Sequence, residues 1–284
     1  MERESESGEM ALPSPRDARD WVLENLGASR TTGNPLPEEY IMDYVDDAFD
    51  QGDKYTCGAC VGALLAEINI IKQSPESYVN IPHPRLSSDF IYYHRLNKPS
   101  NGMFGRDVFS IMKHVGVATE KLYRSFNISP RKAYKDATAR KITGYVTLTT
   151  SDALQRALCD IGPAYILLPY YSRSTRFWMK THASNYRHGY HAVAVIGYNR
   201  DGFIIMNSWG NDWGINGRAL LGYEFWHLVQ EVWVPIYNAA VTNIDKKIGL
   251  LKHSRHMYSD PAVEVSSGSS ESFSFSPSQT CSMS

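Results

Sequence analysis

The spacing of the hydrophobic residues changes near Thr143, and this change constrains the fold more than any other feature of the sequence. Before it, helical spacing predicts a long buried helix with Cys60 in its first turn, and further helices over 87–93 and 107–114. After it, one helix over 151–160 lies among short β-type runs. The runs are Tyr145–Leu148, Ala164–Leu168, Ala192–Tyr198, Phe203–Asn207, Arg218–Tyr223 and Glu231–Ile236. This order predicts an α+β protein with a helical lobe, an antiparallel sheet or barrel lobe, and an active site in the cleft between them.

The two ends of the chain differ from its middle. Residues 1–15 are polar, 16–26 could form a short helix that carries Trp21, and 31–37 are rich in helix breakers. From residue 266 serine dominates, which is typical of disordered segments. We therefore expect an N-terminal extension over 1–35, a folded body over 36–240, and a C-terminal extension over 241–284.

The charge of the chain is balanced. Lys and Arg total 29 against 30 Asp and Glu, and the pI is about 6.8, so nothing favours nucleic acid or a membrane surface as a partner. No apolar stretch approaches the roughly 20 residues of a spanning helix, and the charged N-terminus lacks a secretory signal. Four cysteines are too few for a disulfide scaffold and indicate a reducing compartment. A cytoplasmic or virion-associated protein is expected.

Two segments carry residues that packing alone does not explain. Cys60 is predicted to lie at a helix N-terminus, where the helix dipole favours a thiolate, whereas Cys57 is expected in the preceding loop. In the second half, His191 opens an apolar strand, and Asn207 ends the next one. Asn207 is followed by two tryptophans four residues apart and by three glycines. A nucleophilic cysteine with a histidine base is the chemistry that these residues favour.

These segments resemble the Cys, His and Asn boxes of the papain-like (cathepsin-type, C1) cysteine peptidases. Gln51-Gly52 with Cys57-Gly-Ala-Cys60 resembles the Gln-Gly…Cys-Gly-Ser-Cys box, and His191-Ala-Val resembles the His-Ala-Val box. Residues 207–217 match Asn-Ser-Trp-Gly-x-x-Trp-Gly-x-x-Gly without a mismatch. The similarity in order and spacing covers residues 36–236 and is greatest to the unexported branch found in bacteria and large DNA viruses.

The resemblance implies a role for each matching residue. Cys60 would be the nucleophile and His191 its general base and acid, while Asn207 would orient the imidazole. Gln51 would donate to the oxyanion together with a backbone N–H. Trp209 would shield the pair of His191 and Asn207 from water.

Three departures from the family pattern are visible. Val61 stands where the family has Trp, and three extra residues lengthen the loop from Gln51 to Cys60. The family's disulfide partner for Cys57 would fall near residues 100–102, which contain no cysteine, so Cys57 is expected to be a free thiol. That same loop resembles the one that pairs with extended substrate. It makes Asn101 and Gly102 candidate substrate-binding residues, together with Tyr190 and Trp209 beside the catalytic boxes.

The resemblance implies an endopeptidase that cleaves polypeptides through an acyl-enzyme, without a cofactor or metal, and we expect a monomer. We hypothesise that residues 1–35 pack on the body or near the cleft and regulate access. Three alternatives stay open: an inactive papain-like binding protein, a thiol redox protein that uses Cys57 and Cys60, and a zinc site. The zinc ligands would be Cys57, Cys60, His188 and His191.

Overall fold

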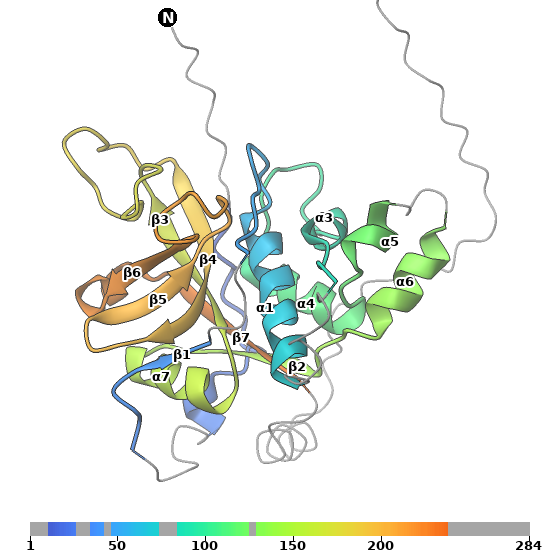
Figure 1. Ribbon diagram of the computed structural model, residues 1–284, viewed down its shortest axis with the longest axis horizontal. Coiled ribbons are helices and arrows are strands. Elements are labelled where there is room, and N and C mark those ends of the chain that lie inside the picture. Colours follow the sequence, from blue (N-terminus) through green and yellow to red (C-terminus); the bar gives the residue numbers. More distant parts are fainter. Residues whose placement is uncertain (1–10, 27–34, 43–46, 74–83, 125–128, 238–284) are drawn as a thin grey trace, which may run out of the picture.

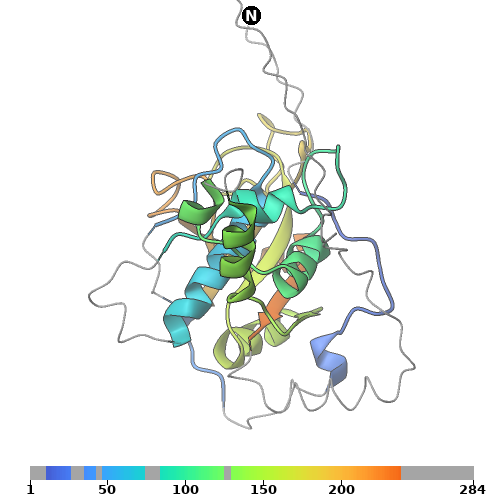
Figure 2. The ribbon, with the colours of Figure 1, turned by 90° about the vertical axis from the view of Figure 1, so that its right-hand side faces the viewer.

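The computed structural model describes residues 11–26, 35–42, 47–73, 84–124 and 129–237, and these form a helical half and a sheet half (Figure 1). Figure 2 views the molecule from the helical side, where the helices lie in front of the sheet. The helices of the helical half are α1 (Cys57–Gln73), α3 (Ser88–Tyr93), α4 (Gly105–His114), α5 (Glu120–Arg124) and α6 (Pro130–Thr138). The predicted α+β class, with helices first and strands second, is confirmed.

Helix α1 runs through the centre of the molecule, between the other helices and the sheet (Figure 1). Its side chains are buried from its first turn to Ile68, because neighbours cover it on both sides. A Cβ on Gly62 would lie 2.6 Å from Val108 Cγ1, so α4 can approach α1 only where this side chain is missing. Cys60 lies in the first turn as predicted, but Cys57 is the first helical residue and not part of the preceding loop.

The shorter helices follow their sequence signals unevenly. Ser87 caps α3, because its side chain accepts a hydrogen bond from the Phe90 N–H at 3.0 Å. Helix α4 begins two residues before the predicted start at Asp107. The sequence did not predict α5 or α6; α5 has no buried residue, and α6 buries only Ala133 and Ala137, so neither contributes a large fully buried side chain.

The sheet half contains, among the described residues, seven antiparallel strands, one α-helix and the 3₁₀ helix η3 (Tyr223–Leu228). The strand order is β2-β7-β3-β4-β5-β6, and β1 pairs with β4 outside this path. The strands are β1 (Tyr40–Ile41), β2 (Gly144–Thr147), β3 (Ala164–Tyr170), β4 (Gly189–Tyr198), β5 (Gly202–Met206), β6 (Arg218–Gly222) and β7 (Glu231–Ile236). Helix α7 (Ser151–Asp160) has the predicted bounds and packs on β3 and β4.

Strand β4 is central because β1, β3 and β5 all pair with it. Its register with β5 shifts between Val195 and Gly197. A Cβ on Gly197 would lie 2.4 Å from the Tyr40 carbonyl oxygen. The glycine therefore permits β1 to approach β4 at this irregularity.

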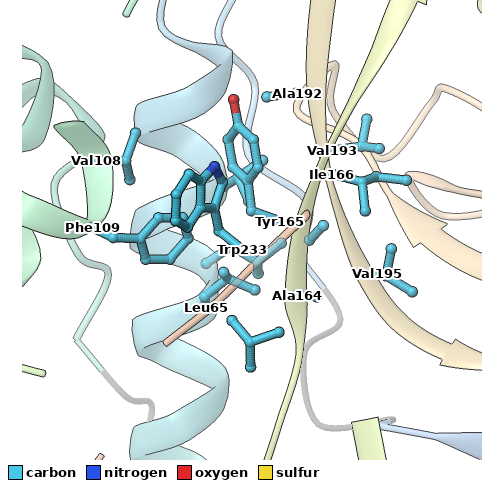
Figure 3. Close-up of a cluster of buried hydrophobic side chains, with 14 of the residues drawn as sticks. Leu65, Val108, Phe109, Ala164, Tyr165, Ile166, Ala192, Val193, Val195 and Trp233 are labelled. Atoms are coloured by element: carbon cyan, nitrogen blue, oxygen red, sulfur yellow. The ribbon is translucent and has the colours of Figure 1, made fainter. Parts of the chain in front are cut away.

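An aromatic cluster fills the space between the halves (Figure 3). Phe109 from α4 contacts Tyr165 from β3 at 5.9 Å between ring centroids and Trp233 from β7 at 6.2 Å. Aromatic pairs at such distances add stabilisation beyond the buried area. The cluster joins α4 to β3 and β7, so the helical half and the sheet half share one core.

Residues 11–26 lie along the body, but they do not form the helix predicted over 16–26. Only Leu23–Leu26 is helical, as one 3₁₀ turn. Val22 instead forms a bridge with Thr147, and the Thr147 N–H donates to the Trp21 carbonyl at 2.8 Å. This pairing with β2 holds Trp21 and Val22 in an extended conformation, which overrides the local helical pattern. Residues 1–10, 27–34 and 238–284 lie outside the described residues, and they include most of the predicted N-terminal extension that remains and all of the C-terminal extension predicted over 241–284.

No helix in the described part of the chain is both long enough and apolar enough to cross a bilayer.

The close approach at Gly197 yields a stability prediction. Gly197→Ala should lower the free energy of unfolding by about 1–3 kcal/mol, because the new Cβ meets backbone that cannot move aside. Gly162→Ala is the matched control, since a Cβ there meets nothing within 4 Å. Urea unfolding of both variants checks this. Equal stabilities would contradict the role given to Gly197.

Candidate active site

The site lies where the first turn of α1 meets β4, at the junction of the two halves (Figure 1). His191 stands on β4 opposite Leu168 of β3 and is fully buried. Asn207 directly follows β5, which pairs with β4. The two side chains come from adjacent strands and meet at the same end of the sheet.

His191 and Asn207 form a direct hydrogen bond. The His191 Nε2 lies 2.7 Å from Asn207 Oδ1, which also accepts from the Ser208 N–H at 2.8 Å. The amide oxygen Asn207 Oδ1 is the acceptor in both bonds, so the His191 Nε2 carries the proton and donates it. The opposite ring atom, Nδ1, is buried without a hydrogen-bond partner among the described residues. The imidazole is therefore held in one orientation, with its Nδ1 as an acceptor that no described residue uses.

Aromatic rings enclose this pair. The Trp209 ring stacks on His191 with 4.6 Å between centroids and 26° between planes. Phe177 approaches the imidazole edge-on at 5.1 Å. These rings exclude water from the bond between His191 and Asn207, which strengthens it in the low dielectric. The shielding role that the resemblance implied for Trp209 fits this geometry.

The two cysteines of the first turn point in different directions. Cys57 faces β4, where the Ala192 backbone N–H acts on its thiol and favours the thiolate. Tyr165 of β3 lies on the same side, where a charge on Cys57 would raise the pKa of its hydroxyl. Cys60 instead donates to Thr56 Oγ1 at 3.8 Å and interacts with Ser88, at the start of α3.

Cys57, and not Cys60, therefore lies next to Ala192, the residue that follows His191, whereas the nucleophile was predicted at Cys60. The physical reason is the start of the helix. The first helical hydrogen bond of α1 runs from the Cys60 N–H to the Thr56 carbonyl at 2.9 Å, so the helix begins at Cys57. When the spacing from Gln51 is counted to Cys57 instead of Cys60, it no longer exceeds the family spacing by three residues. The sequence signal that could have found Cys57 is this spacing.

Gln51 is tied to the Asn207 segment. Its backbone N–H donates to the Ser208 carbonyl at 2.9 Å, and its Oε1 accepts from the Ser208 hydroxyl at 2.6 Å. Its Nε2 donates to the Lys54 carbonyl at 2.7 Å, which uses one of two amide hydrogens. The side chain is buried and held in one orientation, with one N–H left over for a ligand.

The candidate substrate-binding residues fall into two groups. Gly102 has both backbone groups paired internally: its N–H donates to the Tyr92 hydroxyl and its carbonyl accepts from Asn97. Asn101 is exposed. A crossing chain segment donates to two carbonyls, that of Tyr190, a candidate substrate-binding residue, and that of Met103, which was not among the candidates.

That crossing segment is the protein's own N-terminal extension. The Ala11 N–H donates to the Tyr190 carbonyl at 2.9 Å, and the Leu12 N–H donates to the Met103 carbonyl at 3.1 Å. Tyr190 belongs to the sheet half and directly precedes His191, whereas Met103 belongs to the helical half. Two consecutive residues therefore bridge the halves beside the site.

Burial sets the charge state of the site in this arrangement. It raises the pKa of the Cys57 thiol to about 12 and lowers the pKa of His191 to about 4. The hydrogen bond that His191 donates to Asn207 opposes the shift of the His191 pKa, and the Ala192 N–H opposes that of the Cys57 pKa. The covered pair is thus neutral thiol and neutral imidazole.

The described residues contain no arrangement that fits the zinc site or the thioredoxin-type redox site considered above. No group of three or more His, Cys, Asp or Glu side chains there could hold a metal ion, so Cys57, Cys60, His188 and His191 form no zinc site. A thioredoxin-type C-x-x-C motif also requires a strand just before it, and residues 47–56 form no such strand.

Comparison with known proteins agrees with the geometry. The model of the papain family cysteine proteases matches residues 44–224. The chain belongs to this family. An uncharacterized peptidase C1-like protein of Acanthamoeba polyphaga mimivirus is 27% identical over 279 aligned positions, which cover 80% of this chain and 88% of the relative. Chicken (Gallus gallus) cathepsin K is 28% identical, covering 63% of this chain and 55% of that protein.

Solved papain-family structures share the fold. Xylellain, a cysteine protease from Xylella fastidiosa, superimposes with a TM-score of 0.66 at 24% identity, covering 84% of this chain and 99% of that one. A procathepsin B of Trypanosoma congolense gives a TM-score of 0.57 at 15% identity, covering 82% and 88%. The predicted papain-like fold and protease class are therefore confirmed.

The buried imidazole makes stability depend on pH. The unfolded chain takes up a proton on His191 near pH 6.5, whereas burial delays this in the folded protein to about pH 4. The unfolded state binds more protons between these values, so stability falls as the pH falls, by up to about 3 kcal/mol from this group. His191→Gln should remove that contribution.

Urea unfolding at pH 7 and pH 4.5 measures it. The wild-type protein should lose more stability than His191→Gln over this interval, and His227→Gln, at an exposed position, should behave as the wild type. Identical losses in the wild type and His191→Gln would show that the imidazole is not held neutral by burial.

Proposed function

We propose that the protein is a cysteine endopeptidase that uses Cys57 as nucleophile, His191 as general base and acid, and Asn207 to orient the imidazole. The observation that carries the proposal is the bond from His191 Nε2 to Asn207 Oδ1, which leaves Nδ1 unused on the strand that Cys57 faces. Membership of the papain family supports the reaction class.

The residues divide the reaction between them. Nδ1 of His191 takes the thiol proton as the sulfur attacks the peptide carbonyl, and it then protonates the leaving amine. The bond to Asn207 keeps the ring in place through both transfers without adding a charge. Water then attacks the thioester, loses its proton to the same nitrogen, and releases the acid and the Cys57 thiol.

The tetrahedral intermediate needs donors for its oxyanion. The first N–H groups of a helix lack intrahelical partners, so the backbone N–H of Cys57 is suited to this role. The remaining amide hydrogen of Gln51 would be the second donor, since Ser208 and Lys54 fix that side chain. Removing such a donor typically costs about 100- to 1000-fold in turnover.

The structure supports a covered, latent form of this site. Ala11 and Leu12 donate to Tyr190 and Met103, and an extended substrate would need the same two carbonyls. Ala11 and Cys57 are both fully buried. We infer that residues 11–12 occupy substrate positions and must leave before a peptide binds.

The segment is anchored further along by polar contacts. Arg106 binds Asp20 through two nitrogens at 2.9 and 2.5 Å, and the Ser14 N–H donates to Glu231 at 3.1 Å. Glu24 accepts from the backbone and hydroxyl of Thr149. A cavity of about 920 Å³ remains between residues 13–25 and the body. Residues 13–25 are thus held by separate polar contacts and leave a cavity beneath them, and a segment held in this way can be displaced.

The nucleophile is tested by two serine variants. Cys57→Ser should lower kcat/KM on a diverse peptide library at least about 1000-fold, because a hydroxyl cannot replace the thiolate. Cys60→Ser should keep most of the activity, because Cys60 faces α3. An epoxide thiol reagent should label Cys57 faster than Cys60 or Cys159. Activity that survives in Cys57→Ser but is lost in Cys60→Ser would overturn the assignment.

The covering segment is tested without truncation. Ala11→Pro and Leu12→Pro each remove one donating N–H, and each should speed epoxide labelling of Cys57 about fivefold, the equivalent of one hydrogen bond. Ala18→Pro is the control, because Ala18 is exposed at the second position of a turn closed by Asp20 and Asp17. Unchanged labelling in both test variants would show that residues 11–12 do not restrict access.

A further inference from the structure

Cys60 is a buried nucleophilic group that the proposed mechanism does not use. It lies three residues after Cys57 in the first turn of α1, and both thiols are buried. The structure records Cys57, Cys60 and Cys159 as thiols, and Cys159 stands apart on α7, where it contacts the Tyr198 hydroxyl at 3.4 Å. Among these, Cys60 is the thiol that shares a helical turn with Cys57.

The spacing suits a disulfide. Helical positions i and i+3 have Cα atoms about 5 Å apart, inside the range of roughly 4.4–6.8 Å that disulfides span. The two thiols already influence one another, since the charge of Cys60 disfavours the thiolate of Cys57. Cys57 is the first residue of the helix, so its backbone can adjust without breaking a helical hydrogen bond of its own N–H.

Polar groups surround the Cys60 thiol. Burial raises its pKa to about 11; the hydrogen bonds with Ser88 and Thr56 and the positive charge of Arg85 oppose this shift, and the charge of Asp89 adds to it. Thr56 precedes Cys57 directly, so the Cys60 thiol is directed toward the same end of α1. A purely apolar core position would offer none of these polar groups.

We propose that Cys60 is a resolving thiol that converts oxidised Cys57 into a reversible Cys57–Cys60 disulfide. The oxidant is a hydroperoxide, with hydrogen peroxide as the simplest case. The Cys57 sulfur takes one oxygen from the peroxide and becomes a sulfenic acid, and one water leaves. The Cys60 sulfur then attacks the Cys57 sulfur, the S–O bond breaks, an S–S bond forms, and a second water leaves. The proposal rests on Cys57 as the nucleophile.

The consequence is a protease that oxidation switches off without destroying it. The disulfide takes the Cys57 sulfur away from His191, so peptide cleavage stops. It also prevents further oxidation of the sulfenic acid to sulfinic acid, which thiols cannot reverse. A dithiol reductant restores both thiols by exchange.

Mass spectrometry on the full-length protein tests this directly. Lys54 and Lys72 bound a tryptic peptide, residues 55–72, that contains both Cys57 and Cys60 and no further Lys or Arg before its end. Hydrogen peroxide is added until Cys57 can no longer be alkylated. The wild-type peptide should then be lighter by two hydrogen atoms, and dithiothreitol should restore its mass, the alkylation of Cys57 and the peptidase activity.

Three variants complete the design. Cys60→Ser should gain two oxygen atoms on Cys57 instead, and dithiothreitol should not restore alkylation; Cys60→Ala repeats the test with a smaller side chain. Cys159→Ser should behave as the wild type. Equal over-oxidation in the wild type and both Cys60 variants would overturn the proposal and leave Cys60 as a core residue. The mass readout needs no activity, so failure of the Cys57 assignment is detected separately by Cys57→Ser.

Discussion

The contact between the first turn of α1 and strand β4 is the interaction on which the rest of the site depends. It brings the Cys57 thiol of the helical half against Ala192, the residue that follows His191 in the sheet half. The helix can take this central place because Gly62 has no side chain and so lets α4 approach it closely. Gln51 adds a second tie, since it is bonded to Ser208 across the same junction.

Burial shapes the chemistry of this contact. The hydrogen bond between His191 and Asn207 lies under Trp209, where a neutral amide orients the ring more cheaply than a buried carboxylate would. The same burial holds Cys57 and His191 neutral, and in the latent form that we propose Ala11 and Leu12 cover them. Removal of the covering segment admits water and substrate together. Coverage of the site and its charge state are therefore physically linked.

The sequence predicted most of the regular elements but not those that depend on tertiary pairing. Helix α7 and strand β7 have the predicted bounds, because each carries a clear apolar pattern. The helix expected over 16–26 is replaced by pairing with Thr147 of β2. Helices α5 and α6 were missed because they bury almost nothing. A short helix on the surface leaves little trace in hydrophobic periodicity.

The sequence alone determined the family and the partners of the imidazole. The run from Asn207 to Gly217 is specific enough to identify both, and its distance from His191 matches two adjacent antiparallel strands. The expected helix N-terminus did not determine which cysteine faces β4, because Cys57 and Cys60 both fit it. The spacing from Gln51 favours Cys57, but the tertiary structure decided this by fixing where α1 begins. The helix begins at Cys57, and side chains three residues apart on a helix project in directions about 60° apart, so one thiol faces β4 and the other faces α3.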